Sequence, residues 1–317
     1  MGVSKGMESA HVIGRYAGKE EGPLFICIAG MHGNESAGVL AIETVFHLLD
    51  REPLINPGFS FGGRFLGLIG NTRAYREGKR FIKKDINRQW TPENIQRIRQ
   101  APSGQLEAED LEIKELLDVI ETEIGEHRPR RIVLLDLHTT SASGGIFGIA
   151  TDSPESVRIA VELHAPVITG MLRGLRGTTL HFFTKENFNI PAVGVAFEAG
   201  QHEDPLSVNR SISAIINCMR TIGCVKVEDV ENRHDEILLE YSKDLPKIAE
   251  LIKVHSIGEE DLFKMRPGYH NFQPVAKNEI LAEDKNGPIL CPEDGMILMP
   301  LYQMQGSDGF FLIKKIA

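Results

Sequence analysis

The sequence predicts an α/β protein with a mostly parallel or mixed sheet covered by helices on both faces, followed by a small β domain. Apolar runs typical of buried strands alternate with helical patterns over the first 225 residues, as in chains built from βαβ units. After residue 265 come short segments separated by Pro-Gly, Asn-Gly and Asp-Gly pairs, which are typical of turns between strands. We therefore expect two domains, residues 1–225 and 226–317.

The elements are predicted in chain order from apolar periodicity. The expected strands lie at residues 11–16, 24–29, 64–70, 132–137, 177–183 and 192–197. The expected helices lie at residues 36–50, 106–125, 154–171 and 205–221. Residues 71–104 are rich in Arg, Lys and Asn. They are too polar for a core and too long for a plain connector, so this stretch is either functional or mobile. Residues 225–253 are charged and ambiguous.

Composition excludes several classes of partner. The net charge is −9, with Lys and Arg scattered along the chain, so we expect no nucleic acid partner. No apolar run approaches the roughly 18 residues that a membrane span needs, and residues 1–10 have no apolar core typical of a signal peptide. The four cysteines are widely spaced and include no C-x-x-C pair. This usage predicts a reducing, cytoplasmic location.

His32 and Glu35 lie in the turn between the expected strand at 24–29 and the expected helix at 36–50. An imidazole and a carboxylate three residues apart in a tight turn can reach one ion, and such nitrogen and oxygen ligands suit zinc. The His-x-x-Glu pattern is weak by itself, but the carboxyl ends of buried strands are where open α/β sheets place their sites. The alternative is a helix start capped by Asn34 or Ser36, with His32 as a polar turn residue.

His138 ends a second buried strand, so a parallel sheet would bring it to the same edge as His32 and Glu35. Two His and one Glu form the ligand set of a catalytic zinc site, with a fourth position left for water. Asp136 would point to the same face and could accept a hydrogen bond from the His138 ring. The alternative is that His138 merely caps the two threonines that follow it.

Glu198 follows a third buried strand, where a carboxylate is costly unless it has a task or a partner. In a zinc hydrolase the task is that of a general base, and the alternative is a salt-bridged structural residue. The polar stretch adds Arg80, Asn87 and Arg88. An Arg beside an Asn suits a substrate carboxylate, and a second Arg can polarise a scissile carbonyl.

These motifs carry a family resemblance. The chain resembles the succinylglutamate desuccinylase/aspartoacylase family, of the zinc carboxypeptidase-like superfamily, in His32-Gly-Asn-Glu35, Arg80 to Asp85-Ile-Asn-Arg88, Asp136-Leu-His138 and Phe197-Glu198-Ala-Gly200. The resemblance covers residues 20–220 well and the remainder loosely. It implies a three-layer α/β/α catalytic domain with a mixed central sheet. It also implies a single zinc ion on His32, Glu35 and His138, Glu198 as the base, Arg80 as the carbonyl polariser, and Asn87 with Arg88 as a carboxylate clamp.

The resemblance implies a deacylase that cleaves the amide of an N-acyl amino acid or a related small amide. Aspartoacylases of the family carry a further Arg shortly before the catalytic Glu, for a second substrate carboxylate. Here Phe188 takes that position, and the nearest cation is Lys185. The C-terminal Tyr of the family has no clear match, and Tyr302 is a candidate substitute. These differences predict a substrate with one carboxylate rather than N-acetylaspartate or succinylglutamate.

The segments after residue 265 resemble half-barrel strands of biotinyl/lipoyl-like domains, without the lysine that carries the cofactor. We expect a structural module that walls the cleft or mediates homo-oligomers. Two other functions stay open at this point: a metallocarboxypeptidase acting on short peptides, and a catalytically inactive binding protein of the same fold. The presence of Glu198 beside all three ligand candidates argues against the inactive protein.

Overall fold

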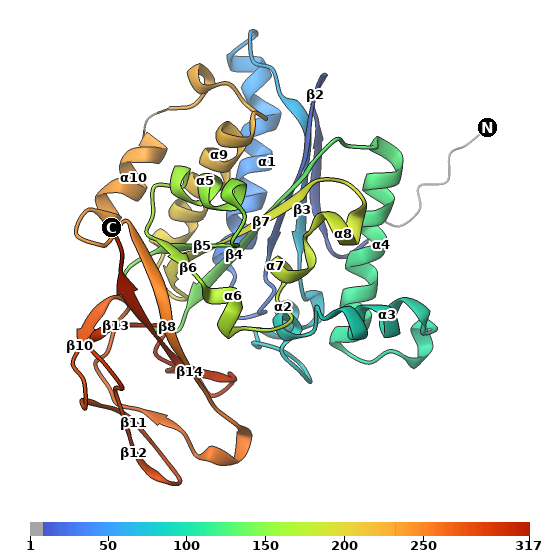
Figure 1. Cartoon of the computed structure of the whole chain (residues 1–317). Coiled ribbons are helices and arrows are strands. Elements are labelled where there is room, and N and C mark those ends of the chain that lie inside the picture. The colour runs from blue at the N-terminus through green and yellow to red at the C-terminus, as the bar shows by residue number, and fades with distance from the viewer. Residues whose placement is uncertain (1–8, 232) are drawn as a thin grey trace.

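A mixed eleven-stranded sheet organises the chain, which the computed structural model describes over residues 9–231 and 233–317 (Figure 1). In spatial order its first five strands are β1 (Val12–Ala17), β3 (Gly62–Ile69), β2 (Glu20–Ala29), β4 (Ile132–Thr140) and β7 (Ala192–Gln201). The other six are β5 (Phe147–Ala150), β6 (Val167–Thr169), β8 (Ile248–Ser256), β14 (Asp308–Lys315), β13 (Gly295–Leu298) and β10 (Gln273–Val275).

The central strands β3, β2, β4 and β7 are parallel, so their carboxyl ends lie at one edge. β1 and β5 join them antiparallel, and β6 and β8 continue the sheet as a parallel pair. The remaining C-terminal strands are antiparallel to their neighbours. The predicted mixed sheet is therefore confirmed.

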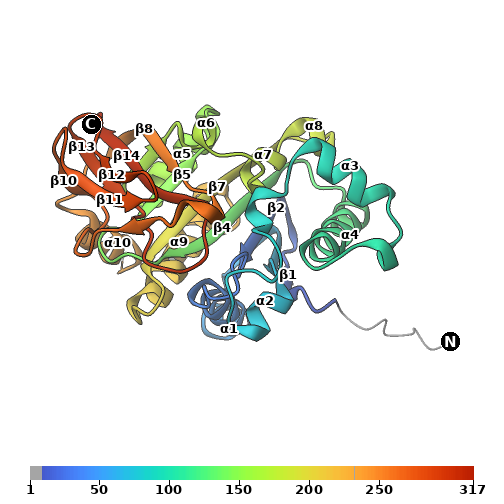
Figure 2. The same ribbon diagram turned by 90° about the horizontal axis from the view of Figure 1, so that it is seen from below.

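Helices cover both faces of this sheet. One face packs against α1 (Ala37–Ile55), α5 (Pro154–Glu162), α9 (Leu206–Ile222) and α10 (Arg233–Ser242). The other packs against α3 (Pro92–Gln100), α4 (Glu109–His127), α6 (Met171–Gly174) and α7 (Thr179–Phe182). Seen from below, α1 and α9 lie on one side of β4 and β7, and α3 and α4 lie on the other (Figure 2).

The alternation of side chains along β2 explains why the strand is apolar throughout. Phe25, Cys27 and Ala29 belong to the core on the α1 side, whereas the residues between them belong to the core on the α4 side. Because successive side chains of a strand point to opposite faces, a strand buried on both faces shows a continuous apolar run. The three-layer α/β/α arrangement follows from this pattern.

Two predicted elements are wrong. The helix expected at residues 154–171 ends at Glu162, because His164 takes a positive φ of 56° and Pro166 cannot continue the helical hydrogen bonds. The strand β6 follows it. The strand expected at residues 177–183 is instead the short helix α7, whose capping box joins Thr178 and His181. The sequence analysis also missed β5, a four-residue strand beside two glycines.

The polar stretch at residues 71–104 is ordered into short elements rather than one connector. It contains α2 (Thr72–Glu77), η1 (Ile86–Arg88), α3 and η2 (Ser103–Gln105). Asn71 caps α2 by accepting a hydrogen bond from the backbone N–H of Ala74. In the chain, α8 (Lys185–Phe188) lies between α7 and β7, and η3 (Val227–Asp229) follows α9.

The chain after residue 248 is almost entirely β structure. Besides β8, β10, β13 and β14 it contains η4 (Glu259–Asp261) and a second sheet of β12 (Gly287–Leu290), β11 (Ile280–Asp284) and β9 (Lys264–Met265). These strands enclose their own apolar core, which includes Leu281, Ile297 and Leu312. The main sheet nevertheless runs across residue 225, because β8 pairs with β6. The division into domains 1–225 and 226–317 stays a prediction.

Within residues 9–231 and 233–317, no helix combines the length and the apolar character that a membrane crossing requires. The four cysteines are buried, and none is in a disulfide. Residues 1–8, which belong to the stretch predicted not to be a signal peptide, lie outside the described residues.

Candidate metal centre and active site

The turn between β2 and α1 places His32 and Glu35 side by side at the carboxyl edge of the sheet. His32 Nδ1 lies 2.8 Å from Glu35 Oε1, and both side chains are buried. A Cβ at Gly33 would lie 2.0 Å from the backbone carbon of Ala74, so only glycine allows this close approach. The turn is not a simple capped helix start. Ser36 makes no side-chain cap, and the Asn34 side chain donates to Gln303.

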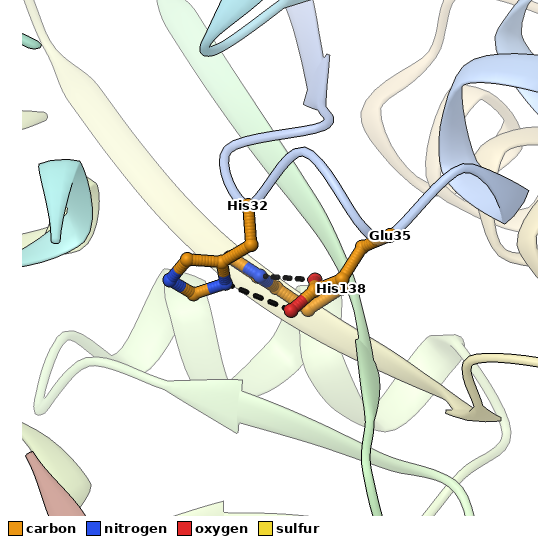
Figure 3. A group of neighbouring side chains, drawn as sticks. All are labelled: His32, Glu35 and His138. Carbon is orange, nitrogen blue, oxygen red and sulfur yellow. Dashed lines mark hydrogen bonds and ion pairs between the residues drawn. The ribbon is translucent and has the colours of Figure 1, made fainter. Parts of the chain in front are cut away.

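His138 reaches the same point from β4. Its Nδ1 lies 3.0 Å from Glu35 Oε2, so the carboxylate of Glu35 lies between the two imidazoles (Figure 3). The ligand atoms of His32, Glu35 and His138 all lie within 4.8 Å of one another. The structure thus brings together the three residues that the sequence analysis selected, and this group could hold a metal ion.

Each histidine also contacts a second carboxylate, through the ring nitrogen that does not face Glu35. His32 Nε2 lies 3.1 Å from Asp85 Oδ1, and His138 Nε2 lies 3.2 Å from Asp136 Oδ2. A carboxylate that accepts from one ring nitrogen leaves the other free to bind a metal and fixes the ring orientation. The donor set therefore fits a divalent ion that prefers nitrogen and oxygen, with both Nδ1 atoms turned inward. The sequence analysis proposed this role for Asp136 but assigned none to Asp85, although Asp85 lies within a quoted motif.

The electrostatics of the cluster follow from burial and mutual contact. Burial alone would raise the pKa of Glu35, but His32 and His138 hold it well below its ordinary value. Burial alone would lower the pKa of His138, but Asp136 and Glu35 together raise it well above its ordinary value. The protonation states of Glu35 and His138 therefore depend on each other. A divalent cation can bind to such a group in place of its protons.

Glu198 lies beside this cluster on β7, in register with His138 on β4. It is 6% exposed, and its Oε2 has no hydrogen-bond partner among the described residues. Burial raises the pKa of Glu198 to about 8, with His138 opposing and Glu35 adding to the shift. A buried carboxyl with a free oxygen and a pKa near neutrality has the properties that a general base requires.

The loop from Arg80 to Arg88 supplies the nearby cations. Arg80 contacts Glu35 Oε1 at 3.5 Å and Asp85 Oδ2 at 3.3 Å, so its guanidinium faces the cluster. Asn87 Oδ1 accepts from the backbone N–H of Thr179, and its Nδ2 lies 3.4 Å from His138 Nε2. Arg88 points away from the cluster, and its Nη2 contacts Asp308 Oδ2 at 2.5 Å. Sequence reasoning missed Asp308, which is 220 residues away along the chain.

Glu109 fixes the loop that carries Arg80 and Asp85. It is fully buried at the first turn of α4, and its carboxylate accepts from the backbone N–H groups of Ile82, Lys83 and Lys84. The Oε1–Ile82 contact is 2.6 Å. One carboxylate thereby satisfies three consecutive backbone donors next to the cluster.

Glu109→Ala should therefore lower both stability and activity. Three backbone donors would lose their acceptor, and we expect the free energy of unfolding to fall by about 3 kcal/mol. Urea unfolding measures this loss of stability. Steady-state kinetics measures the loss of activity that follows when the loop carrying Arg80 is displaced. The matched control is Glu107→Ala, which removes an exposed carboxylate paired with Lys83 on the same segment. Equal losses in both variants would contradict the role of Glu109.

The cluster lies in one cleft of about 830 Å³, which includes space open to solvent. Its walls combine the cluster, Glu198 and the loop cations with apolar side chains that include Ile149, Leu172, Leu175 and Phe311. The C-terminal segment closes one side through Met299, Leu301, Gln303, Ser307 and Asp308.

Two residues singled out in the sequence lie outside this cleft. Phe188 packs against Phe182 and Phe183, with ring centroids 5.3 and 5.2 Å away, and does not line the cleft. The hydroxyl of Tyr302 donates to the carbonyl of Arg266 and accepts from the N–H of Tyr269. Tyr302 therefore does not substitute for the C-terminal Tyr of the family.

The fold and the cluster define an α/β protein with a His-Glu-His group suited to a metal ion at the carboxyl edge of its sheet. Residues 21–221 match the model of the succinylglutamate desuccinylase/aspartoacylase catalytic domain. The chain belongs to this family, whose names describe hydrolases that release an acyl group from a small acylated amino acid.

The relatives agree with this assignment. A succinylglutamate desuccinylase of Ectopseudomonas mendocina is 25% identical over 289 residues, covering 87% of this chain and 80% of that protein. A probable aspartoacylase of Nostoc sp. is 30% identical over 119 residues, but this covers only 38% of this chain and 36% of that protein.

Solved structures show the same fold. The succinylglutamate desuccinylase/aspartoacylase from Rhodobacter sphaeroides superposes with a TM-score of 0.64 at 16% identity, covering 94% of this chain and 86% of that one. The ectoine utilization protein EutE (DoeB) from Ruegeria pomeroyi has a TM-score of 0.62, also at 16% identity, over 95% and 88% of the two chains. At these identities the likeness shows the fold alone.

Proposed function

We propose that the protein is a zinc-dependent deacylase that hydrolyses the amide bond of an N-acyl amino acid or a related small amide. The observation that carries the proposal is the buried His32, Glu35 and His138 group beside Glu198, whose carboxyl has an oxygen without a hydrogen-bond partner in the described part of the chain. Two imidazoles and one carboxylate are the ligand set of catalytic zinc sites, and this set leaves room for water and substrate.

When bound, zinc supplies Lewis acidity toward the attacking water and the scissile carbonyl. The chain supplies the proton transfers. Glu198 accepts a proton from the water at its free oxygen and returns it to the departing amine nitrogen. Arg80, which contacts Glu35 and Asp85, is the proposed group that stabilises the negative charge that develops on the carbonyl oxygen.

Asn87 and Arg88 are the proposed contacts for the substrate carboxylate. Both line the cleft, but Arg88 already pairs with Asp308, so a substrate carboxylate would have to use its remaining N–H groups. A wall from the C-terminal segment lines one side of the cleft, through residues between 299 and 308. It supports a small amide over a peptide, and we propose that the C-terminal module contributes this wall to a catalytic domain formed by residues 1–225.

Metal analysis combined with an amine-release assay tests the proposal. Protein purified without chelator should contain about one zinc ion per chain, and it should release free amine from N-acyl amino acids. Chelation should abolish the release, and added zinc should restore it. Protein that lacks stoichiometric metal and gains no hydrolysis on addition of zinc would show that the cluster is not a catalytic metal site.

A further inference from the structure

The most informative contact outside the metal cluster is the ion pair between Arg88 and Asp308. Arg88 Nη2 lies 2.5 Å from Asp308 Oδ2, and Arg88 Nη1 donates to the backbone carbonyl of Asn87 at 2.8 Å. Both residues line the cleft, with side chains 23% and 12% exposed. The cation proposed to receive a substrate carboxylate is therefore already neutralised by a carboxylate of the protein itself.

Asp308 is anchored to the sheet rather than carried on a free loop. It is the first residue of β14 and pairs with Ser256 of β8. The preceding carbonyl, of Ser307, accepts a hydrogen bond from the backbone N–H of Ile257 at 2.8 Å. Because these contacts lie at the end of the β8–β14 ladder, the backbone of Asp308 is anchored to the sheet beside the cleft.

The charge balance of the cleft leaves little room for a second substrate anion. Among the described residues that line it, the arginines are Arg80 and Arg88, and each already faces a carboxylate. Glu35 and Asp136 would offset a bound dication. A first substrate carboxylate can still use the remaining N–H groups of Arg88, but a second would meet the negative charge of Asp308 without a cation to match it.

Three further cations from nearby segments of the chain do not supply the missing positive charge. Arg173, Arg176 and Lys185 are exposed and do not line the cleft, and Arg173 pairs with Glu250. The other side chains that line the cleft, apart from Glu198 and the two histidines, are uncharged, and the apolar ones among them suit an uncharged side chain or acyl group. They include Ile149, Leu172, Leu175 and Leu301.

We propose that Asp308 is a specificity-determining residue that restricts the enzyme to N-acyl amino acids with a single carboxylate. This inference rests on the proposed deacylase function and names its substrate class. Asp308 holds Arg88 in a neutral pair and repels substrates with a second carboxylate. The discrimination is a property of this pair and not of Phe188, which lies outside the cleft.

The test compares N-acetyl-leucine with N-acetylaspartate in the zinc-loaded wild type and in Asp308→Asn. Asparagine keeps the shape and the hydrogen bond to Arg88 but removes the charge. We expect the wild type to favour N-acetyl-leucine, and the ratio of kcat/KM for N-acetylaspartate over N-acetyl-leucine to rise at least about tenfold in the variant. Asp244→Asn, at an exposed turn position after α10, is the matched control and should leave the ratio unchanged.

The ratio of the two kcat/KM values distinguishes electrostatic discrimination by Asp308 from a structural role. If Asp308 only positioned Arg88, the variant would lower kcat/KM for both substrates equally, and the proposal would be overturned. A wild type that already favours N-acetylaspartate would overturn it too.

Titration calorimetry with the amino acid products tests the role of Asp308 independently of the proposed hydrolysis. If no N-acyl amino acid is hydrolysed, the deacylase function fails. The discrimination by Asp308 is then tested by the binding of leucine and aspartate alone. Asp308→Asn should increase the affinity for aspartate relative to leucine at least about tenfold, and an unchanged ratio of affinities counts against it. Asp308→Ser, checked by thermal unfolding, provides the same comparison should the asparagine variant not fold.

Discussion

Glu198→Gln should lower kcat by on the order of 10²–10⁴ while leaving the metal content unchanged. Glutamine keeps the shape of the side chain but cannot take up a proton. Because Glu198 is not one of the three ligand candidates, its loss should affect the proton transfers and not the binding of zinc. Steady-state kinetics and elemental analysis on the same preparation measure both effects.

The matched control is Glu203→Gln, which changes an exposed carboxylate just after β7 and should keep wild-type turnover. A Glu198→Gln variant with near-wild-type kcat would show that another group transfers the proton. A variant that loses its metal would instead show that Glu198 is a ligand, contrary to the proposed roles.

The same substitution should stabilise the metal-stripped protein at higher pH. The pKa of Glu198 is raised from 4.5 to about 8 in the fold, so wild-type stability declines as pH rises from the unfolded value toward the folded one. Glutamine does not titrate. The advantage of the variant in thermal unfolding should therefore grow across that pH window and level off above it. A constant difference in Tm would mean that the Glu198 carboxyl is not buried as a neutral acid.

Periodicity and strand ends predicted the grouping of His32, Glu35 and His138 because they depend on local sequence. The apolar runs before His32 and His138 predict two buried strands, and parallel strands deliver the residues after them to one edge. The pairing of β2 with β4 then brings the two histidines together. The layers of the fold were predicted for the same reason.

The contacts that shape specificity depend on long-range packing and could not be predicted. Asp308 meets Arg88 only because β14 pairs with β8 and β8 with β6, and no local pattern specifies that order of strands. Phe188 was compared with a family position by counting along the chain. The count ignored the fold of α7 and α8, which turns Phe188 toward Phe182 and Phe183. The strand expected at residues 177–183 overlaps α7, and no element is expected from the sequence at α8.

Glu35→Gln should abolish zinc binding and, with it, hydrolysis. Glu35 lies between both imidazoles, accepts from the backbone N–H of Thr139 and contacts Arg80. A neutral amide removes the only anionic ligand of the three. We expect activity to fall by on the order of 10³ or more, since the Lewis acid contributes several kcal/mol to the reaction. Glu43→Gln, at an exposed position of α1, is the matched control and should change neither zinc content nor rate.

The response of thermal stability to chelation distinguishes a metal ligand from a structural ion pair. Zinc bound to the folded state should stabilise the wild type by about 4 kcal/mol when free zinc exceeds Kd by 1,000-fold, so a chelator should lower its Tm. In Glu35→Gln the chelator should have no effect on Tm, because no zinc is bound. If Glu35 served only to pair the two histidines, the variant would be less stable but would still bind zinc, respond to the chelator and hydrolyse the amide. That combination would exclude Glu35 from the metal site.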